Sequence, residues 1–411
     1  MDHLDKNNIL NKIQHGFRQK RSCETQLITT INDFSNCLNK RGQIDSILLD
    51  FSKAFDKVDH LGLIKKMQQY RISDNLIQWT KSFLIGRNQK VTVEGIESNT
   101  IKVKSGVPQG TVLGPLFFLL YINDINLNLT KGTKMRLFAD DSLLYRQIKS
   151  KKDCEILQKD LNTLQDWEKK WKMEFHPQKC QVLTITKKRN TIKAKYYIHN
   201  EILNETNSAK YLGVIIDSEL DWKDQNKAVC KKANSILAFL KRNIHDCPQP
   251  IKEKCYKALV KPILEYGCCV WDPHTEKYIN ELEKIHKNAA RFVTKNYHHV
   301  SGNTKKNMNK LGWIPLEEHR ARIKVNLFHK GINKLIDIPT EQYPAVSHRI
   351  NTRQNKPQMY SIPHSRIDCH LHSFFPSTIR LWNSVPTGIK ISETTEAFKK
   401  AITHITLKTE Y

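Results

Sequence analysis

Hydrophobic residues along the first half of the chain alternate between strand-like and helix-like spacing. The apolar residues 47–49, in "DSILLDFSKAF", have the length of a buried strand, and residues 52–72 follow with helical spacing. The elements predicted after them are a helix at 74–86 capped by Ser73, a hairpin at 89–95 and 99–106, a buried helix at 110–125, a strand, turn and strand at 134–148, an amphipathic helix at 154–173, and strands at 179–186 and 210–217. The pattern indicates a domain of mixed helix and sheet.

After about residue 217 the pattern changes to helices rich in lysine and arginine. These are predicted at 226–244, 251–267, 277–295 and 316–336. Residues 338–386 are dotted with proline and serine and predict no regular element. The longest apolar run, "VLGPLFFLLYI", is too short to span a bilayer, which takes about 20 residues. We therefore expect a mainly helical, basic second half and no membrane-spanning segment.

The composition of the chain predicts a polyanionic partner. The chain has 411 residues, of which 39% are hydrophobic, and carries 67 Lys and Arg against 41 Asp and Glu, a formal net charge of +26. A charge this large predicts nucleic acid as the partner, with an anionic membrane surface as the second choice and a solvated basic surface as the plain alternative. The N-terminus shows no signal peptide.

The ten cysteines include no C-x-x-C pair, which together with the missing signal peptide favours reduced thiols inside the cell. Nothing in the sequence separates nucleus from cytoplasm. A zinc site built from Cys247, Cys255 and Cys369 stays open as an alternative, although their spacing fits no known pattern.

Two adjacent aspartates, Asp140 and Asp141, interrupt the apolar run "LFADDSLLY". Alone, they could form an ordinary polar turn. Asp50 ends another apolar strand, however, and if the two strands are neighbours in one sheet their ends meet. Three carboxylates at one sheet edge offer the oxygen ligands that hard divalent cations prefer. Such a site in a basic protein suits phosphoryl transfer on a polynucleotide.

These segments resemble the palm of reverse transcriptases from non-LTR (LINE-like) retrotransposons of the jockey and CR1 kind. In chain order they are "QHGFRQKRSCETQL" before the palm, "LLDFSKAFDKVDH" (motif A), "SGVPQGTVLGPLFFLLYINDI" (motif B), "FADDSLLY" (motif C), "HPQKCQVLTIT" (motif D), "AKYLGVIID" (motif E), and the tail segments "LVKPILEYGCCVWDP" and "SFFPSTIRLWNSVP". Relative to that family the chain is expected to be N-terminally truncated, because the upstream fingers motifs are missing.

The resemblance implies an α+β fold, a right-hand polymerase palm with partial fingers. The reverse transcriptase domain would cover residues 1–216, a helical thumb or connection residues 217–337, and a C-terminal extension of unknown role residues 338–411.

The resemblance also implies roles for residues at the matched positions. Asp50, Asp140 and Asp141 would be the catalytic carboxylates. Asp50 and Asp140 would be the main ligands of two Mg²⁺ ions, for which Mn²⁺ is an alternative, and the backbone carbonyl of Phe51 would join them. Lys179 would donate a proton to the leaving pyrophosphate; a solvated lysine is the alternative reading.

Three further residues would shape the nucleotide site. Phe55 would be the steric gate that excludes a ribose 2′-OH, and Gln109 and Gly110 would contact the incoming nucleotide and the template. From the residues alone, Phe55 could be a core aromatic, and the glutamine and glycine could belong to an ordinary turn before a helix.

The leading hypothesis is therefore an RNA-directed DNA polymerase that extends a DNA primer on an RNA template with deoxynucleoside triphosphates. The alternative is a catalytically impaired, nucleic-acid-binding remnant of such an element, because the residues that hold the triphosphate in the fingers are missing. An RNA-directed RNA polymerase is a third hypothesis, and Phe55 argues against it. Protein partners are not indicated.

Overall fold

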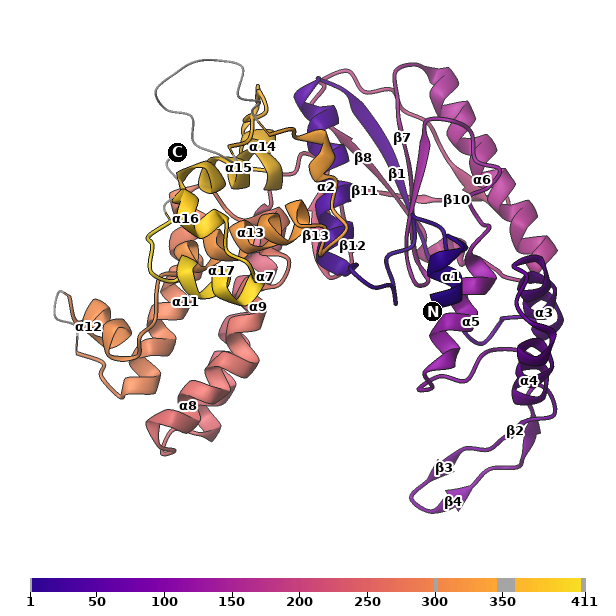
Figure 1. Ribbon diagram of the computed structural model, residues 1–411, viewed down its shortest axis with the longest axis horizontal. Helices are drawn as coiled ribbons and strands as arrows, with labels where there is room; N and C mark the ends of the chain where they lie inside the picture. The colour runs from indigo at the N-terminus through magenta and orange to yellow at the C-terminus, as the bar shows by residue number, and fades with distance from the viewer. Residues whose placement is uncertain (1, 299–301, 346–358, 408–411) are drawn as a thin grey trace. The chain divides into compact units, whose positions relative to one another are not determined.

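The computed structural model describes residues 2–298, 302–345 and 359–407, and the chain forms two compact units (Figure 1). The first unit comprises Met1–Cys23 and Arg41–Ala209, and the second Glu24–Lys40 and Lys210–Tyr411. The helix α2 (Cys23–Asn39), which the sequence pattern did not predict, thus belongs almost wholly to the second unit. The division expected at residues 216 and 337 stays a prediction.

A five-stranded sheet forms the centre of the first unit (Figure 1), in the order β11-β8-β1-β7-β6. The strands are β1 (Gln43–Leu49), β6 (Thr133–Phe138), β7 (Asp141–Gln147), β8 (Gln181–Thr186) and β11 (Asn204–Thr206). Neighbours are antiparallel except β11, which runs parallel to β8. The expected strands at 47–49, 134–148 and 179–186 are confirmed, and β1 lies between the other two segments.

Four helices pack their apolar side chains with alternate residues of the sheet. Ile47 and Leu49 of β1 are buried in one cluster with these helices, as the period of two in a strand requires. The helices of this unit are α1 (Asp2–Lys6) and the four packing helices α3 (His60–Gln69), α4 (Asp74–Leu84), α5 (Leu113–Ile122) and α6 (Lys151–Trp171), with a 3₁₀ turn η1 (Pro177–Lys179). This mixed sheet and helix core agrees with the expected α+β palm.

The helix expected at 52–72 begins only at His60, so the first part of that prediction is wrong. Residues 51–56 form a turn in which Lys53 has a φ of 53°. The Asp59 carboxylate accepts a hydrogen bond from the Gly62 N–H at 2.8 Å and so caps the helix at its true start. The residues before Asp59 have helical spacing but do not form a helix, because the backbone of Phe55 is bound by a different loop, described below.

Short strand pairs complete the first unit. They are β2 (Asn88–Gln89) with β5 (Ile101–Lys102), β3 (Thr92–Val93) with β4 (Ile96–Glu97), and β9 (Tyr197–Ile198) with β10 (Glu201–Ile202). A hairpin is present as expected, but its turn lies at Glu94 and Gly95, inside the strand predicted at 89–95. The strand expected at 210–217 is instead two strands, β12 (Ser208–Tyr211) and β13 (Val214–Asp217). Gly213 breaks it with a φ of +83°, a conformation that favours glycine.

The second unit is mainly helical, as expected. Beyond α2, its helices are α7 (Lys223–Asn243), α8 (Gln249–Cys255), the π-helical turn η2 (Tyr256–Val260), α9 (Lys261–Glu265), α10 (Cys268–Trp271), α11 (Glu276–Thr294), α12 (Asn303–Lys310), α13 (Leu316–Ile332), the 3₁₀ turn η3 (Thr340–Gln342), α14 (Asp368–Leu371), α15 (Phe374–Ser384), α16 (Thr387–Lys390) and α17 (Thr395–Ile402). The single helix expected at 251–267 is interrupted by the π-helical turn η2, and Pro262, the second residue of α9, has no N–H to donate to that turn. Part of the unassigned stretch 338–386 lies outside the described residues.

Two buried histidines, His286 and His370, and the partly buried His372 are expected to make the second unit sensitive to acid. His286 hydrogen-bonds the Tyr256 hydroxyl at 2.6 Å and the Ile314 carbonyl at 3.1 Å. Burial lowers the pKa of His286, His370 and His372 from 6.5 to about 4. These imidazoles stay neutral in the folded chain, while in the unfolded chain they titrate near pH 6.5. Stability that is present above pH 6.5 is therefore lost as the pH falls toward 4.

We expect the calorimetric unfolding temperature to fall steadily between these two pH values, and to fall less in the variant His286→Gln. An unfolding temperature that is constant over the range would show that burial does not keep these imidazoles neutral.

In the described parts of the chain, no helix combines the length and the apolar character needed to cross a bilayer. The ten cysteines all lie within the described residues, and no disulfide links them. Among the described residues no three His, Cys, Asp or Glu side chains form a ready-made metal cluster, so Cys247, Cys255 and Cys369 give the zinc alternative no support.

Candidate functional site

The first unit brings the three expected carboxylates to one edge of its sheet. In the β6–β7 hairpin Phe138 pairs with Asp141, which leaves Ala139 and Asp140 as the turn. On the other side of β7, Ser142 lies opposite Leu49 of β1. Asp50 follows Leu49 directly, so it leaves the sheet beside the hairpin turn that carries the other two aspartates.

The charges of these carboxylates act on one another. Burial raises the pKa of Asp140, and the nearby Asp50 carboxylate raises it further. Burial also raises the pKa of Asp141, followed by the charges of Asp140 and Asp50. Negative charges this close to Asp140 and Asp141 favour the binding of a cation, which neutralises them. The only cation paired with Asp50 within the described residues is Lys179, whose Nζ lies 3.5 Å from the Asp50 Oδ2.

A divalent ion fits this donor set. All the donors are oxygen atoms, and the side chain of Asp50 is 43% exposed, so the edge is open to solvent and to a substrate. The carboxylates do not by themselves close into a cage, since no cluster of three such groups forms within the described residues. An open set is what Mg²⁺ uses when substrate phosphates and water supply its remaining ligands.

The backbone of Phe51 presents its carbonyl to the same edge. Phe51 forms an antiparallel bridge with Phe175, and the rings of the two residues stack at 4.4 Å. The hydrogen bonds of this bridge are made by the residues on either side of it. The His176 N–H donates to the Asp50 carbonyl at 2.8 Å, and the Ser52 N–H donates to the Glu174 carbonyl at 2.8 Å. The C=O of Phe51 therefore points the other way, toward the side of β1 on which β7 lies.

The loop before α5 is bound to the turn after β1. The Val107 N–H donates to the Phe55 carbonyl at 2.9 Å. Gly106 approaches the turn so closely that a Cβ there would lie 2.8 Å from the Asp56 Cα. The ring of Phe55, half-buried, stacks on Phe118 of α5 at 4.4 Å. The backbone and the ring of Phe55 are thus both fixed at the edge of the core.

Gln109 and Gly110 lie in the same loop and are both exposed. The Gln109 amide donates to the Asp56 Oδ1 at 2.9 Å, so this glutamine contacts the turn that follows the carboxylate strand. Gly110 has a φ of +75°, and a Cβ at this position would meet nothing within 4 Å. Space next to its backbone is therefore open to a ligand.

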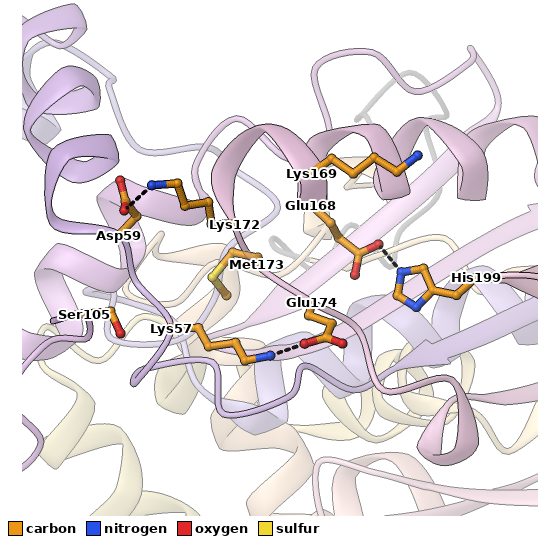
Figure 2. Close-up of a pocket in the computed structure, with 9 residues that line it drawn as sticks. All are labelled: Lys57, Asp59, Ser105, Glu168, Lys169, Lys172, Met173, Glu174 and His199. Atoms are coloured by element: carbon orange, nitrogen blue, oxygen red, sulfur yellow. Dashed lines mark hydrogen bonds and ion pairs between the residues drawn. The ribbon is translucent and has the colours of Figure 1, made fainter.

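A cavity of about 430 Å³ lies beside these elements but contains none of the expected site residues (Figure 2). Its lining residues are Lys57, Asp59, Ser105, Glu168, Lys169, Lys172, Met173, Glu174 and His199. Figure 2 shows three ion pairs across it, Lys57 with Glu174, Lys172 with Asp59 at 2.8 Å, and His199 with Glu168 at 3.1 Å. Because most of the charged groups are paired with one another within the lining, we interpret these residues as a structural support of the site.

Two residues that support Asp50 were not singled out from the sequence. The Cys180 Sγ, fully buried, accepts a hydrogen bond from the Asp50 N–H at 3.4 Å. The buried Glu168 accepts from the Phe175 N–H and so fixes the segment that bridges to Phe51. Neither residue could be recognised from its sequence neighbours, since each contacts a segment far away in the chain. The position of Glu168 on the apolar side of α6 was the one feature of the sequence that pointed to a buried role.

His15 and Arg18 belong to the segment "QHGFR" that precedes the palm. The structure places His15 in the core, where its N–H donates to the Leu137 carbonyl at 2.8 Å. The Arg18 guanidinium donates to the Asn11 carbonyl at 3.2 Å and lies 3.6 Å from Asp5. Both residues therefore contact neighbouring parts of the same unit.

Comparison with known proteins agrees with this geometry. Residues 1–216 match the family described as "Reverse transcriptase (RNA-dependent DNA polymerase)". The chain is 30% identical, over 69% of its length, to "RNA-directed DNA polymerase from mobile element jockey" of Drosophila funebris, of which it covers 32%. It is 26% identical, over 86% of its length, to "Probable RNA-directed DNA polymerase from transposon X-element" of Drosophila melanogaster, of which it covers 39%.

The chain thus spans little more than a third of the curated relatives it matches. Among solved structures, the apo telomerase of Candida tropicalis is similar with a TM-score of 0.42 and 13% identity, over 74% of this chain and 50% of that chain.

Proposed function

Since the chain belongs to the reverse transcriptase (RNA-dependent DNA polymerase) family, we propose that it adds deoxynucleoside triphosphates to the 3′-OH of a DNA primer on an RNA template. The observation that carries the proposal is the meeting of Asp50, Asp140 and Asp141 at one sheet edge, where burial and, to a lesser extent, the charge of Asp50 raise the pKa of both others. The excess of positive charge on the chain supports a nucleic-acid substrate.

Enzymes of this family use divalent metal ions. We infer two Mg²⁺ ions, replaceable by Mn²⁺, with Asp50, Asp140 and the Phe51 carbonyl as ligands and Asp141 beside them. When bound, such ions activate the primer hydroxyl and neutralise the charge of the reacting phosphates. The part played by the protein is to hold these oxygen atoms at the end of a rigid sheet, so that primer and nucleotide meet in line.

We infer that Lys179 acts on the leaving group. It ends the 3₁₀ turn η1, and its side chain is 63% exposed while its ammonium group reaches Asp50. A mobile ammonium group beside the carboxylates can move to the leaving pyrophosphate and give it a proton. Gln109 and Gly110 would contact the incoming nucleotide and the template from the opposite loop.

Phe55 is inferred to select the sugar of the incoming nucleotide. Its ring is fixed by Phe118 and its backbone by Val107, so it cannot swing away from a ribose 2′-OH. In the variant Phe55→Val we expect incorporation of ribonucleotides to rise at least about tenfold relative to deoxynucleotides, since a steric clash worth more than 1.4 kcal/mol is removed.

The measurement is primer extension with dTTP and with UTP, with Phe83→Val, a nearby aromatic of α4, as the matched control. An unchanged ratio in Phe55→Val would remove Phe55 from the sugar site.

The test of the proposed function is extension of oligo(dT) on poly(rA) with dTTP and Mg²⁺, with the full chain. Synthesis that requires the metal supports a polymerase. No synthesis by the folded chain, together with RNA binding that weakens as salt is raised, would favour the alternative function, a nucleic-acid-binding remnant. The net charge of +26 is the observation that supports this second function.

A further inference from the structure

Gln14 lies under the turn that carries Asp140. Its side chain is only 3% exposed, and the segment around it pairs with β6: the Leu137 N–H donates to the Ile13 carbonyl at 3.0 Å. The Gln14 Oε1 accepts from the Ala139 N–H at 2.9 Å, and its Nε2 donates to the Ala139 carbonyl at 3.3 Å. One buried amide therefore binds both backbone groups of the residue just before Asp140.

The turn needs such support. Ala139 has a φ of 54°, a left-handed conformation that costs a residue with a Cβ about 1 kcal/mol or more. The two carboxylates that follow repel each other and Asp50. A turn under this strain keeps one conformation only if its surroundings hold it, and within the described residues the side-chain hydrogen bonds to Ala139 come from Gln14.

Gly16 brings the supporting segment close enough. A Cβ on Gly16 would lie 2.4 Å from the Ala139 N, a distance that no real contact allows. The Gly16 N–H donates at 2.7 Å to the same Gln14 Oε1 that holds Ala139. The glycine thus lets the backbone approach the turn, and the glutamine amide joins the two segments.

We propose that Gln14 is a positioning residue of the metal site, which fixes Asp140 through the backbone of Ala139. The inference rests on the proposed function, because Asp140 is taken there as a metal ligand. Groups that orient the ligands of a metal site commonly affect metal affinity or activity by about 10- to 100-fold when they are removed. A purely structural role would lower stability and leave metal affinity unchanged.

The test compares the parent chain with Gln14→Leu, which keeps the shape of the side chain and removes all three hydrogen bonds. Gln19→Leu is the matched control, since Gln19 is an exposed glutamine in the same segment. Three quantities are measured: hydrogen exchange of the peptide 137–142, the concentration of free Mn²⁺ that gives half of the maximal thermal stabilisation, and kcat and KM for dTTP.

We expect faster exchange in Gln14→Leu, about a tenfold higher Mn²⁺ midpoint, and a lower kcat with KM little changed. Exchange and Mn²⁺ midpoint equal to the parent would overturn the proposal. The Mn²⁺ and exchange measurements test the role of Gln14 even if the parent makes no product. A parent that makes no product would count against the proposed function and not against the role of Gln14.

If Gln14→Leu does not fold, Gly16→Ala is measured in its place. This variant keeps the amide and displaces the turn, so the same shifts are expected, and their absence would equally overturn the proposal.

Discussion

Replacing Asp140 and Asp141 together by asparagine is expected to abolish metal-dependent primer extension. Asparagine keeps the size of each side chain and removes the charges that we propose to hold divalent ions at the sheet edge. A loss of at least about a thousandfold in rate is expected, equivalent to roughly 4 kcal/mol of transition-state stabilisation. The measurement is incorporation of dTTP on poly(rA)/oligo(dT), in Mg²⁺ and in Mn²⁺.

The matched control is the double variant Asp74→Asn, Asp166→Asn. Both residues are exposed on helices of the same unit, α4 and α6, so the change in net charge is identical. This control is expected to extend primers like the parent. Extension by the Asp140, Asp141 double variant within twofold of the control would show that the two carboxylates hold no catalytic metal.

The same substitution is expected to stabilise the chain when no metal is present. Because burial, and after it the charge of Asp50, raises the pKa of both residues, the charged carboxylates are held together at a cost in folding free energy. Removal of two of them should raise the unfolding free energy in EDTA by roughly 1 kcal/mol, as happens where function requires unfavourable charge. Mg²⁺ should then stabilise the parent and leave the variant unaffected.

The carboxylates could be predicted from the sequence because each lies beside a strong local signal. The apolar run before Asp50 and the alternating run after Asp141 have the length and period of strands, and the structure has β1 and β7 there. Strand pairing then fixes the rest, since the register assigns each residue one partner on each adjacent strand. The order of motifs supplied the assumption that these two strands pair.

The supporting contacts could not be predicted, because they depend on residues far apart in the chain. Gln14 reaches Ala139 across 125 positions, and Cys180 reaches Asp50 across 130. No periodicity marks such residues. The turn at 51–56 was mistaken for helix for the same reason: the groups that hold Phe55 lie in the loop around Val107, and local spacing cannot show them.

The second prediction with a large effect concerns a buried ionic cluster in the second unit. Asp272 binds the Arg320 Nε and the Lys324 Nζ, each at 2.6 Å. The side chains are 8%, 0% and 3% exposed, respectively. Burial acts to raise the pKa of Asp272, but Lys324 and Arg320 outweigh it and hold that pKa below its usual value. One carboxylate therefore pairs with two buried cations.

Asp272→Asn is expected to lower the free energy of unfolding by about 3–5 kcal/mol, because it leaves two buried charges without a counter-ion. Asp224→Asn, an exposed aspartate of α7, is the matched control and should cost no more than about 0.5 kcal/mol. Adding Arg320→Met and Lys324→Met to Asp272→Asn should restore much of the loss, since apolar side chains of similar size carry no desolvation penalty. Urea unfolding measures all three. If the triple variant is no more stable than Asp272→Asn, the loss comes from packing and not from uncompensated charge.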